Sequence, residues 1–128
     1  MIKIKFRLWE KELKAMITAE NSDQFLISLD GRVFDTGFTF SSQAEYCKNM
    51  TAMQFTGLKD KNGVEIYEGD IVNGWNNNPN GIHIVEYVSD KYNCGFMARE
   101  VNGLGKIHVW YDGLKVIGNI HENHELLK

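Results

Sequence analysis

The residues Met53–Val72, MQFTGLKDKNGVEIYEGDIV, decide the fold of this chain. They include the turn dipeptide Asn62-Gly63 and the pair Gly69-Asp70, which stands directly before two apolar residues. Asn and Gly tolerate the backbone angles of tight turns, and an Asp carboxylate can accept hydrogen bonds from nearby N–H groups where a strand begins. These residues therefore predict tight turns between short strands, and none of them is a reaction centre.

Apolar and polar residues alternate along most of the chain, as they do in strands with one buried face. Asp30-Gly31 separates two apolar runs, which is a strong signal for a β-hairpin. Strands with turn signals between them are predicted at residues 2–9, 13–19, 25–29, 32–35, 51–56, 64–67, 71–72, 82–88, 94–101, 106–111 and 114–120. Many short strands at near-regular spacing are typical of a small barrel or sandwich.

We therefore predict an all-β fold in which a small barrel, residues 51–128, carries an N-terminal section rich in β-hairpins, residues 1–50. No low-complexity linker separates the two sections, so we expect them to pack together. A single continuous domain of residues 1–128 is the alternative. Two short stretches favour helix, namely Ser41–Glu45 with a serine as N-cap and a single turn around Asn123–Leu127.

The composition is that of an ordinary globular protein, with 128 residues of which 43% are hydrophobic and 24% charged. The formal net charge of -3 disfavours general attraction to nucleic acid, which usually needs a basic excess. The chain has no apolar run of roughly 18 residues, and its first residues alternate apolar and basic, which argues against a transmembrane helix or a signal peptide. Cys47 and Cys94 are far apart in sequence, so we expect free thiols in a cytoplasmic protein.

Three segments together resemble the YopX-like family of phage and prophage proteins. They are Met53–Val72, the opening residues Ile4–Trp9 (IKFRLW) and the residues Val116–Asn123 (VIGNIHEN). The resemblance implies a β-rich fold with a barrel of the SH3 type. It also implies that the protein comes from a phage or prophage and acts in the cytoplasm of the host bacterium. The biochemical function of the family is unassigned, so the resemblance supplies no catalytic residues. Residues Ala15–Cys47 match no pattern of the family, which leaves the architecture of that segment open.

The sequence contains no recognisable motif for binding phosphate or calcium. The glycines of Met53–Val72 fall six residues apart, which matches neither the dinucleotide-binding pattern nor the P-loop, so turns are the better interpretation. Asp60 and Asn62 suggest the start of a calcium loop, but Val64 stands where the third oxygen ligand belongs.

Metal or acid–base chemistry is also weakly supported. Glu65, Glu68 and Asp70 are close in sequence, but a strand would send the two glutamates to opposite faces. His121 and His124 could share one helical face, but two ligands do not complete a zinc site, and no cysteine pair lies at ligand spacing.

A nucleophile is equally weakly supported. Cys47 has no base beside it in sequence, and no nucleophile-turn motif occurs. We therefore expect a protein that is not an enzyme and that holds no cofactor or metal.

Two strand faces combine cations with aromatic residues. The candidate surface residues are Lys3, Lys5, Arg7 and Trp9 on the first, and Lys106, His108 and Trp110 on the second. Such faces can hold a phosphate backbone while a base stacks on the ring. The alternative is the ordinary outer face of an antiparallel sheet, where cations pair with acids on adjacent strands. Trp75, in a loop rich in asparagine, is a further candidate if its ring is exposed.

The leading hypothesis is a non-enzymatic module for protein–protein interaction or self-assembly, acting through exposed sheet edges and aromatic strand faces. The rival from another class is a nucleic-acid-binding accessory protein of the phage that uses the basic faces. A weaker third class is a metal-dependent hydrolase. The nucleic-acid hypothesis loses its support if acids from neighbouring strands interleave with the lysines.

Overall fold

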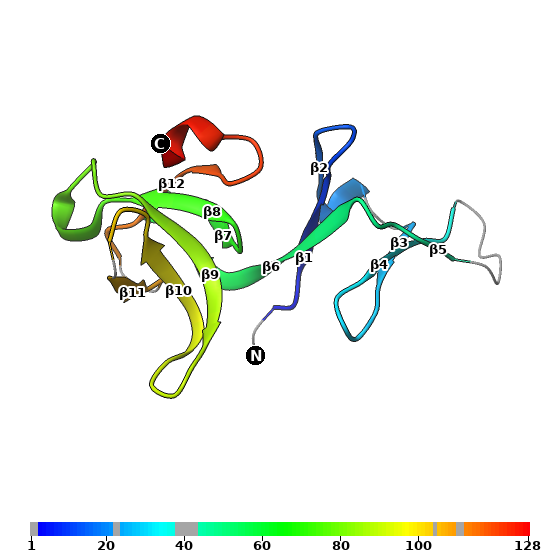
Figure 1. Cartoon of the computed structure of the whole chain (residues 1–128), viewed down its shortest axis with the longest axis horizontal. Coiled ribbons are helices and arrows are strands. Elements are labelled where there is room, and N and C mark those ends of the chain that lie inside the picture. The colour runs from blue at the N-terminus through cyan, green and yellow to red at the C-terminus, as the bar shows by residue number, and fades with distance from the viewer. Residues whose placement is uncertain (1–2, 22–23, 38–43, 104, 110–111) are drawn as a thin grey trace. The chain divides into compact units, whose positions relative to one another are not determined.

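The computed structural model is all-β, as the sequence predicted (Figure 1). It describes every residue except 1–2, 22–23, 38–43, 104 and 110–111. The described residues form twelve β-strands and three short 3-10 helices, and they contain no α-helix. None of the helices in this described part has the length and hydrophobicity that a membrane-spanning segment requires.

The chain folds into two compact units. The N-terminal unit is Lys5–Gln54, and the C-terminal unit is Phe55–Lys128 together with Met1–Ile4. The boundary lies inside one long strand, β6 (Met50–Lys59), which contributes its first half to one unit and its second half to the other. The sequence placed the corresponding boundary after residue 50, at the start of this strand.

The C-terminal unit is a curled antiparallel sheet with one extra strand. Its strands after β6 are β7 (Glu65–Tyr67), β8 (Asp70–Asn73), β9 (His83–Ser89), β10 (Cys94–Glu100), β11 (Lys106–His108) and β12 (Lys115–Asn119). The sheet order is β11-β10-β9-β8-β12, while β7 pairs with the second half of β6. The 3-10 helices η2 (Trp75–Asn77) and η3 (His124–Leu127) follow β8 and β12. The sheet curls into a half-barrel, which is consistent with the barrel that the resemblance implied.

Apolar residues from these strands and the turn after β11 form the core of the C-terminal unit. The buried cluster consists of Ile66, Val72, Val85, Ala98, Val109 and Leu114. Phe96, Ile107 and Val116 pack against it. A large apolar side chain contributes roughly 1.5–3 kcal/mol when it leaves water, so this shared cluster explains why short strands hold together.

The N-terminal unit contains two groups of paired strands. Its elements are β1 (Phe6–Glu10), β2 (Ala15–Ile17), the 3-10 helix η1 (Ala19–Asn21), β3 (Phe25–Ile27), β4 (Val33–Asp35), β5 (Glu45–Tyr46) and the first half of β6. β1 lies between β2 and β6, and β4 lies between β3 and β5. Asp30-Gly31 lies in the loop between β3 and β4, with Gly31 at a φ of +87°. The hairpin that the sequence predicted here is therefore confirmed.

Two predictions about local structure need correction. The first strand begins at Phe6, and residues 3–5 precede it without strand structure, while Ile2 lies outside the described residues. The helix expected over Ser41–Glu45 is wrong at its last residue, because Glu45 lies in β5, and residues 41–43 are not described. The helical turn expected around Asn123–Leu127 is confirmed as η3.

The two turns predicted within Met53–Val72 are confirmed. Gly63 has a φ of +82°, and its N–H donates to the carbonyl of Asp60 at 3.0 Å. Gly69 has a φ of +84°, and the carboxylate of Asp70 accepts the backbone N–H of Tyr67 at 2.8 Å. Asp70, the first residue of β8, thus stabilises the turn through which the chain enters that strand. This is the role that the sequence predicted for Gly69-Asp70.

Candidate functional site

Asp60 anchors the turn between β6 and β7 and connects it to β12. Its Oδ1 accepts the N–H groups of Asn62 and Val64 at 2.8 and 2.9 Å, and its Oδ2 accepts the N–H of Val116 at 2.8 Å. Burial by itself would raise the pKa of Asp60, but these three donors outweigh it and lower the pKa overall. Because both carboxylate oxygens bind backbone groups, Asp60 has a structural role here in place of the calcium-ligand role considered above.

The segment Val116–Asn123 also builds backbone structure. The side-chain oxygen of Asn119 accepts the N–H groups of His121 and Glu122 at 3.0 and 2.9 Å. The backbone N–H of Asn119 donates to the side-chain oxygen of Asn123 at 3.0 Å. These reciprocal bonds fold the chain between β12 and η3, so the side chains of Asn119 and Asn123 have a structural role in this family-like segment.

The described residues bring together no group of three or more His, Cys, Asp or Glu side chains that could ligate a metal. His83 is buried, at 4% exposure, and its Nδ1 has no hydrogen-bond partner among the described residues. His108 and His124 are exposed, whereas His121 is half-buried. The histidines therefore do not form the metal centre that the hydrolase hypothesis would need within this part of the chain.

The environment of Cys47 among the described residues disfavours an activated nucleophile. Burial, and then the carboxylates of Asp35 and Glu45, raise the pKa of its thiol. A raised pKa keeps the thiol protonated at neutral pH, and the thiolate is the reactive form. Cys94 is exposed, and both cysteines are free thiols, as the sequence predicted.

The first predicted surface does not present an aromatic ring to solvent. Trp9 is buried, at 7% exposure, although strand alternation placed it with the cations. Arg7 is half-buried, and a terminal nitrogen of its guanidinium donates to the sulfur of Met53 at 3.9 Å. Lys3 is exposed but belongs to the C-terminal unit, whereas the half-buried Lys5 belongs to the N-terminal unit. Trp9 is therefore unavailable for stacking on a base in this structure.

The second predicted surface is partly outside the described residues, because Trp110 is not described. Lys106 and His108 are exposed on β11, which is an edge strand. Lys106 forms an ion pair with Asp90 at 3.8 Å. Trp75 is half-buried in η2, so its ring is not the exposed platform that would favour recognition.

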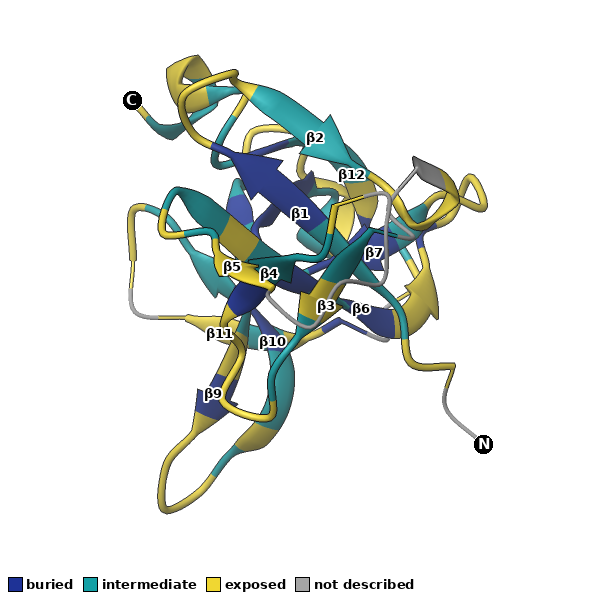
Figure 2. Cartoon of the chain, turned by 90° about the vertical axis from the view of Figure 1, so that its right-hand side faces the viewer, coloured by how far each residue is buried: buried dark blue, intermediate teal, exposed yellow. Residues whose placement is uncertain are grey.

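A row of apolar side chains, exposed at both ends and half-buried at Phe34 in the middle, crosses the sheet formed by β3, β4 and β5. The sequence did not single it out. Leu26, Phe34 and Tyr46 are direct cross-strand partners, so they share one face. Leu26 and Tyr46 are 56% and 57% exposed, and Figure 2 shows the exposed positions of β3 and β5 in yellow. The rings of Phe34 and Tyr46 pack at 5.7 Å between centroids.

Arg32 lies over this row. Its guanidinium carbon is 5.5 Å from the ring centre of Phe34 and 6.0 Å from that of Tyr46. Cations at this distance from an aromatic face are attracted by it. We call Leu26, Arg32, Phe34 and Tyr46 the β4 face.

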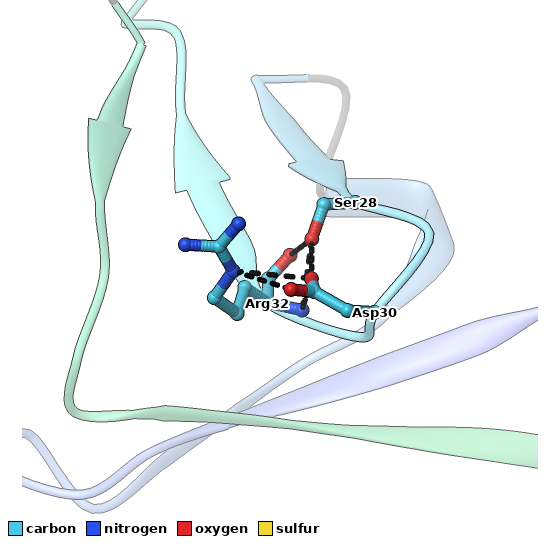
Figure 3. A network of polar contacts seen from close by, with 3 residues as sticks. All are labelled: Ser28, Asp30 and Arg32. Atoms are coloured by element: carbon cyan, nitrogen blue, oxygen red, sulfur yellow. Dashed lines mark hydrogen bonds and ion pairs between the residues drawn. The ribbon is translucent and has the colours of Figure 1, made fainter.

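A polar network in the β3–β4 loop holds Arg32 in place (Figure 3). The Nε of Arg32 donates to both carboxylate oxygens of Asp30, at 3.1 and 2.9 Å. The hydroxyl of Ser28 donates to the same carboxylate. The bond from Ser28 and the interaction with Arg32 lower the pKa of Asp30 to about 2, so this carboxylate is charged at neutral pH.

A second group of exposed aromatic residues lies on the β9–β10 hairpin. Tyr87 and Tyr92 are exposed, and Tyr87 packs edge-to-face on Phe96 at 5.4 Å. The hydroxyl of Tyr87 lies 3.3 Å from the sulfur of Cys94, and this contact raises the pKa of Tyr87. Lys91 lies over the ring of Tyr92 at 5.5 Å. Tyr87 and Phe96 are cross-strand partners on two strands, whereas the apolar row of the β4 face crosses three.

One sequence signal could have indicated the β4 face. Ser28, Arg32 and Phe34 stand at even spacing around the predicted Asp30-Gly31 turn, and residues two apart in a strand share a face. The contribution of Tyr46 could not be found in this way, because its pairing with Phe34 joins segments on either side of residues 38–43.

A family model described as YopX protein matches residues 5–128 of the chain. The chain belongs to the YopX family. This confirms the resemblance that its opening, middle and closing segments suggested. No curated protein sequence matched it.

Two solved structures of similar proteins extend the comparison. Protein EF1440 from Enterococcus faecalis is 29% identical, with a TM-score of 0.62 and all of both chains covered. Protein yopX from Bacillus subtilis is 18% identical, with a TM-score of 0.54 over 97% of this chain and 95% of that one. The second likeness concerns the fold alone. For this YopX-family chain, the family-like segments Met53–Val72 and Val116–Asn123 are those in which Asp60, Asp70 and Asn119 bind the backbone.

Proposed function

We propose that this YopX-family chain is a non-enzymatic protein-interaction module that binds its partner through the β4 face. One observation carries the proposal: Leu26 and Tyr46, each more than half exposed, flank Phe34 across three paired strands. Single exposed apolar residues are common on protein surfaces, but a contiguous group is typical of an interaction site. Aromatic residues and arginine are also the residue types enriched where proteins bind each other.

The polar residues of the family-like segments Met53–Val72 and Val116–Asn123 support binding over catalysis as the role of the chain. Asp60, Asp70 and Asn119 accept backbone N–H groups, so their side chains support turns. The thiol of Cys47 has a raised pKa, which disfavours its use as a nucleophile.

We also propose that the protein originates from a phage or prophage and acts in the cytoplasm of a bacterial host. The support is the resemblance of its three family-like segments to such proteins. The similar structures from Enterococcus faecalis and Bacillus subtilis are in keeping with a bacterial setting.

The nucleic-acid alternative has less support, because acids stand beside the cations of the C-terminal sheet. Lys106 pairs with Asp90, and Arg99 pairs with Glu86 on the adjacent strand at 3.2 Å. The formal net charge of the chain is -3. A phosphate backbone is bound by cations that release its counterions, and paired cations contribute less to that effect.

The test compares three tagged forms of the full chain in a bacterium that expresses it, using cross-linking and mass spectrometry. The first is the parent chain, and the second carries Leu26→Ser and Tyr46→Ser on the β4 face. The matched control carries Tyr87→Ser and Tyr92→Ser, which also removes two exposed apolar side chains, but from the C-terminal unit. Circular dichroism checks that each variant folds, and light scattering reports self-assembly.

We expect the parent chain and the control to recover the same defined protein partner, and the β4-face variant to lose it. A second copy of the chain counts as that partner if light scattering shows an oligomer that only the β4-face variant loses. Equal recovery by all three forms would contradict the proposed surface. Binding to DNA or RNA that strengthens at low salt, without a protein partner, would support the nucleic-acid alternative instead.

A further inference from the structure

The guanidinium of Arg32 is held in one orientation by contacts on two sides. Its Nε binds both oxygens of Asp30, and the carboxylate of Asp30 is itself held by the hydroxyl of Ser28. The guanidinium carbon also lies 5.5 and 6.0 Å from the ring centres of Phe34 and Tyr46. An arginine whose orientation is already set loses less conformational freedom when it binds a partner.

The two terminal nitrogens of Arg32 face away from Asp30, as Figure 3 shows. Among the described residues, the hydrogen bonds of the Arg32 side chain all use Nε. The side chain is 56% exposed, so the pair of terminal nitrogens is accessible from solvent. Such a pair matches the geometry of a carboxylate, which it can bind through two parallel hydrogen bonds.

We propose that the β4 face binds a protein segment in which an Asp or Glu stands beside an apolar side chain. The carboxylate would pair with the terminal nitrogens of Arg32, and the apolar side chain would cover Leu26 and Tyr46. This inference rests on the proposed function and adds the chemistry of the partner. The terminal nitrogens of Arg32 and the exposed side chains of Leu26 and Tyr46 are the two features that such a segment complements.

A protein carboxylate fits this face better than a nucleic-acid backbone. Asp30 balances the charge of Arg32, so the pair offers directed hydrogen bonds without a strong positive field. Asp35 and Glu45 are cross-strand partners on the opposite face of the same sheet, so they do not repel an acidic segment on the β4 face. Binding to a phosphate backbone depends instead on several uncompensated cations.

The experiment selects binders from a displayed library of random short peptides on the immobilised full chain. Selected peptides are then synthesised in their acidic form and with the acid replaced by its amide, and their affinities are measured. The protein variants are Arg32→Gln, which removes the guanidinium, and Arg32→Lys, which keeps the charge without the fork. The matched control is Arg99→Gln, because Arg99 also binds a carboxylate through Nε but lies on β10 in the C-terminal unit.

We expect the selected peptides to be enriched in an acid next to an apolar residue. Their affinity should fall about tenfold for Arg32→Gln and for the amide peptides, and the two losses should not add, since both remove the same pair of hydrogen bonds. Arg32→Lys should lose several-fold, and Arg99→Gln should bind like the parent chain.

Three other results would overturn the inference. Some peptides could need Leu26 and Tyr46 for binding and yet bind Arg32→Gln as well as the parent chain. That result would agree with the proposed interaction module and would contradict a pairing between Arg32 and a carboxylate. Failure to select any peptide that the double variant Leu26→Ser/Tyr46→Ser loses would count against both the inference and the proposed function. Binding of a single-stranded oligonucleotide that is lost in Arg32→Gln would assign the face to nucleic acid.

Discussion

The carboxylate of Asp60 accepts a hydrogen bond from the backbone N–H of Val116, 56 residues further along the chain, at 2.8 Å. The same carboxylate binds two N–H groups of its own turn. One side chain therefore joins the turn between β6 and β7 to β12. Asp60, which the sequence suggested as part of a turn or of a calcium loop, thus connects two of the three family-like segments.

Replacing Asp60 should weaken the fold. Asp60→Asn removes the charge and one acceptor oxygen, and it turns an amide N–H₂ toward a backbone donor. We expect the free energy of unfolding to fall by about 2–3 kcal/mol, because three backbone N–H groups would lose a charged acceptor. Urea unfolding followed by fluorescence measures the loss. Asp112→Asn, at an exposed position, is the control and should be neutral, and equal stability of the two variants would refute this role for Asp60.

Acid should also weaken the fold through Asp60. Its pKa in the folded chain lies below the ordinary value of 3.8, so its contribution to stability is fully present above that pH. The contribution is lost as the pH falls through the lower pKa of the folded state. Between about pH 5 and about pH 2, the parent chain should therefore lose more stability than Asp60→Asn. Urea midpoints across this range test the difference, and parallel curves for the two proteins would contradict it.

The close contact between Gly118 and Asn123 gives a third prediction. A Cβ on Gly118 would lie 2.5 Å from the side-chain oxygen of Asn123, the atom that accepts the N–H of Asn119. Gly118→Ala should therefore displace Asn123 and cost about 1–2 kcal/mol of stability.

A double-mutant cycle separates this cause from general strain at Gly118. In the Asn123→Ala background the clash with the Asn123 side-chain oxygen is absent, so Gly118→Ala should cost clearly less there. An unchanged cost in that background would show that Asn123 is not the reason.

Trp9 should behave as a core residue and not as a binding platform. Trp9→Ala should destabilise the protein by about 3–5 kcal/mol, because it removes a large buried side chain. Lys3→Ala, at an exposed position, should change stability by less than about 0.5 kcal/mol. Thermal unfolding of both variants provides the measurement. A Trp9→Ala protein as stable as the parent would mean that the ring is not packed.

The two cysteines should react at different rates with a thiol reagent. Cys94 is exposed, whereas Cys47 is half-buried and its thiol pKa is raised. We expect two kinetic phases under native conditions, since only the thiolate reacts. Cys47→Ser should remove the slow phase and Cys94→Ser the fast one. A single fast phase in the parent chain would contradict the environment described for Cys47.

Local features of the fold were predictable, and features that depend on packing were not. The Asp30-Gly31 and Asn62-Gly63 turns follow from residues that accept positive φ at small cost. The prediction for Trp9 was wrong, because alternation placed its ring on the exposed face and the structure buries it. Alternation assumes one solvated face, but Leu8, Trp9 and Glu10 are all buried in succession on β1, which lies between two other strands.

The candidate site shows the same division. Strand alternation alone would place Arg32 and Phe34 on one face, because they stand two residues apart. It could not bring Tyr46 or Leu26 beside them, because those contacts depend on the registers of β3 and β5 against β4. The sequence therefore indicated cations that alternate along one predicted strand, namely Lys3, Lys5 and Arg7.

By itself the sequence determined the all-β class, the principal turns and the family, because turn chemistry and alternating polarity are properties of neighbouring residues. Only the tertiary structure decided that Asp60 binds Val116 and that Leu26, Phe34 and Tyr46 form one cross-strand row beside Arg32. Both arrangements join residues distant in the chain. The register that brings them together is set by burial and strand pairing, which local residue preferences do not encode.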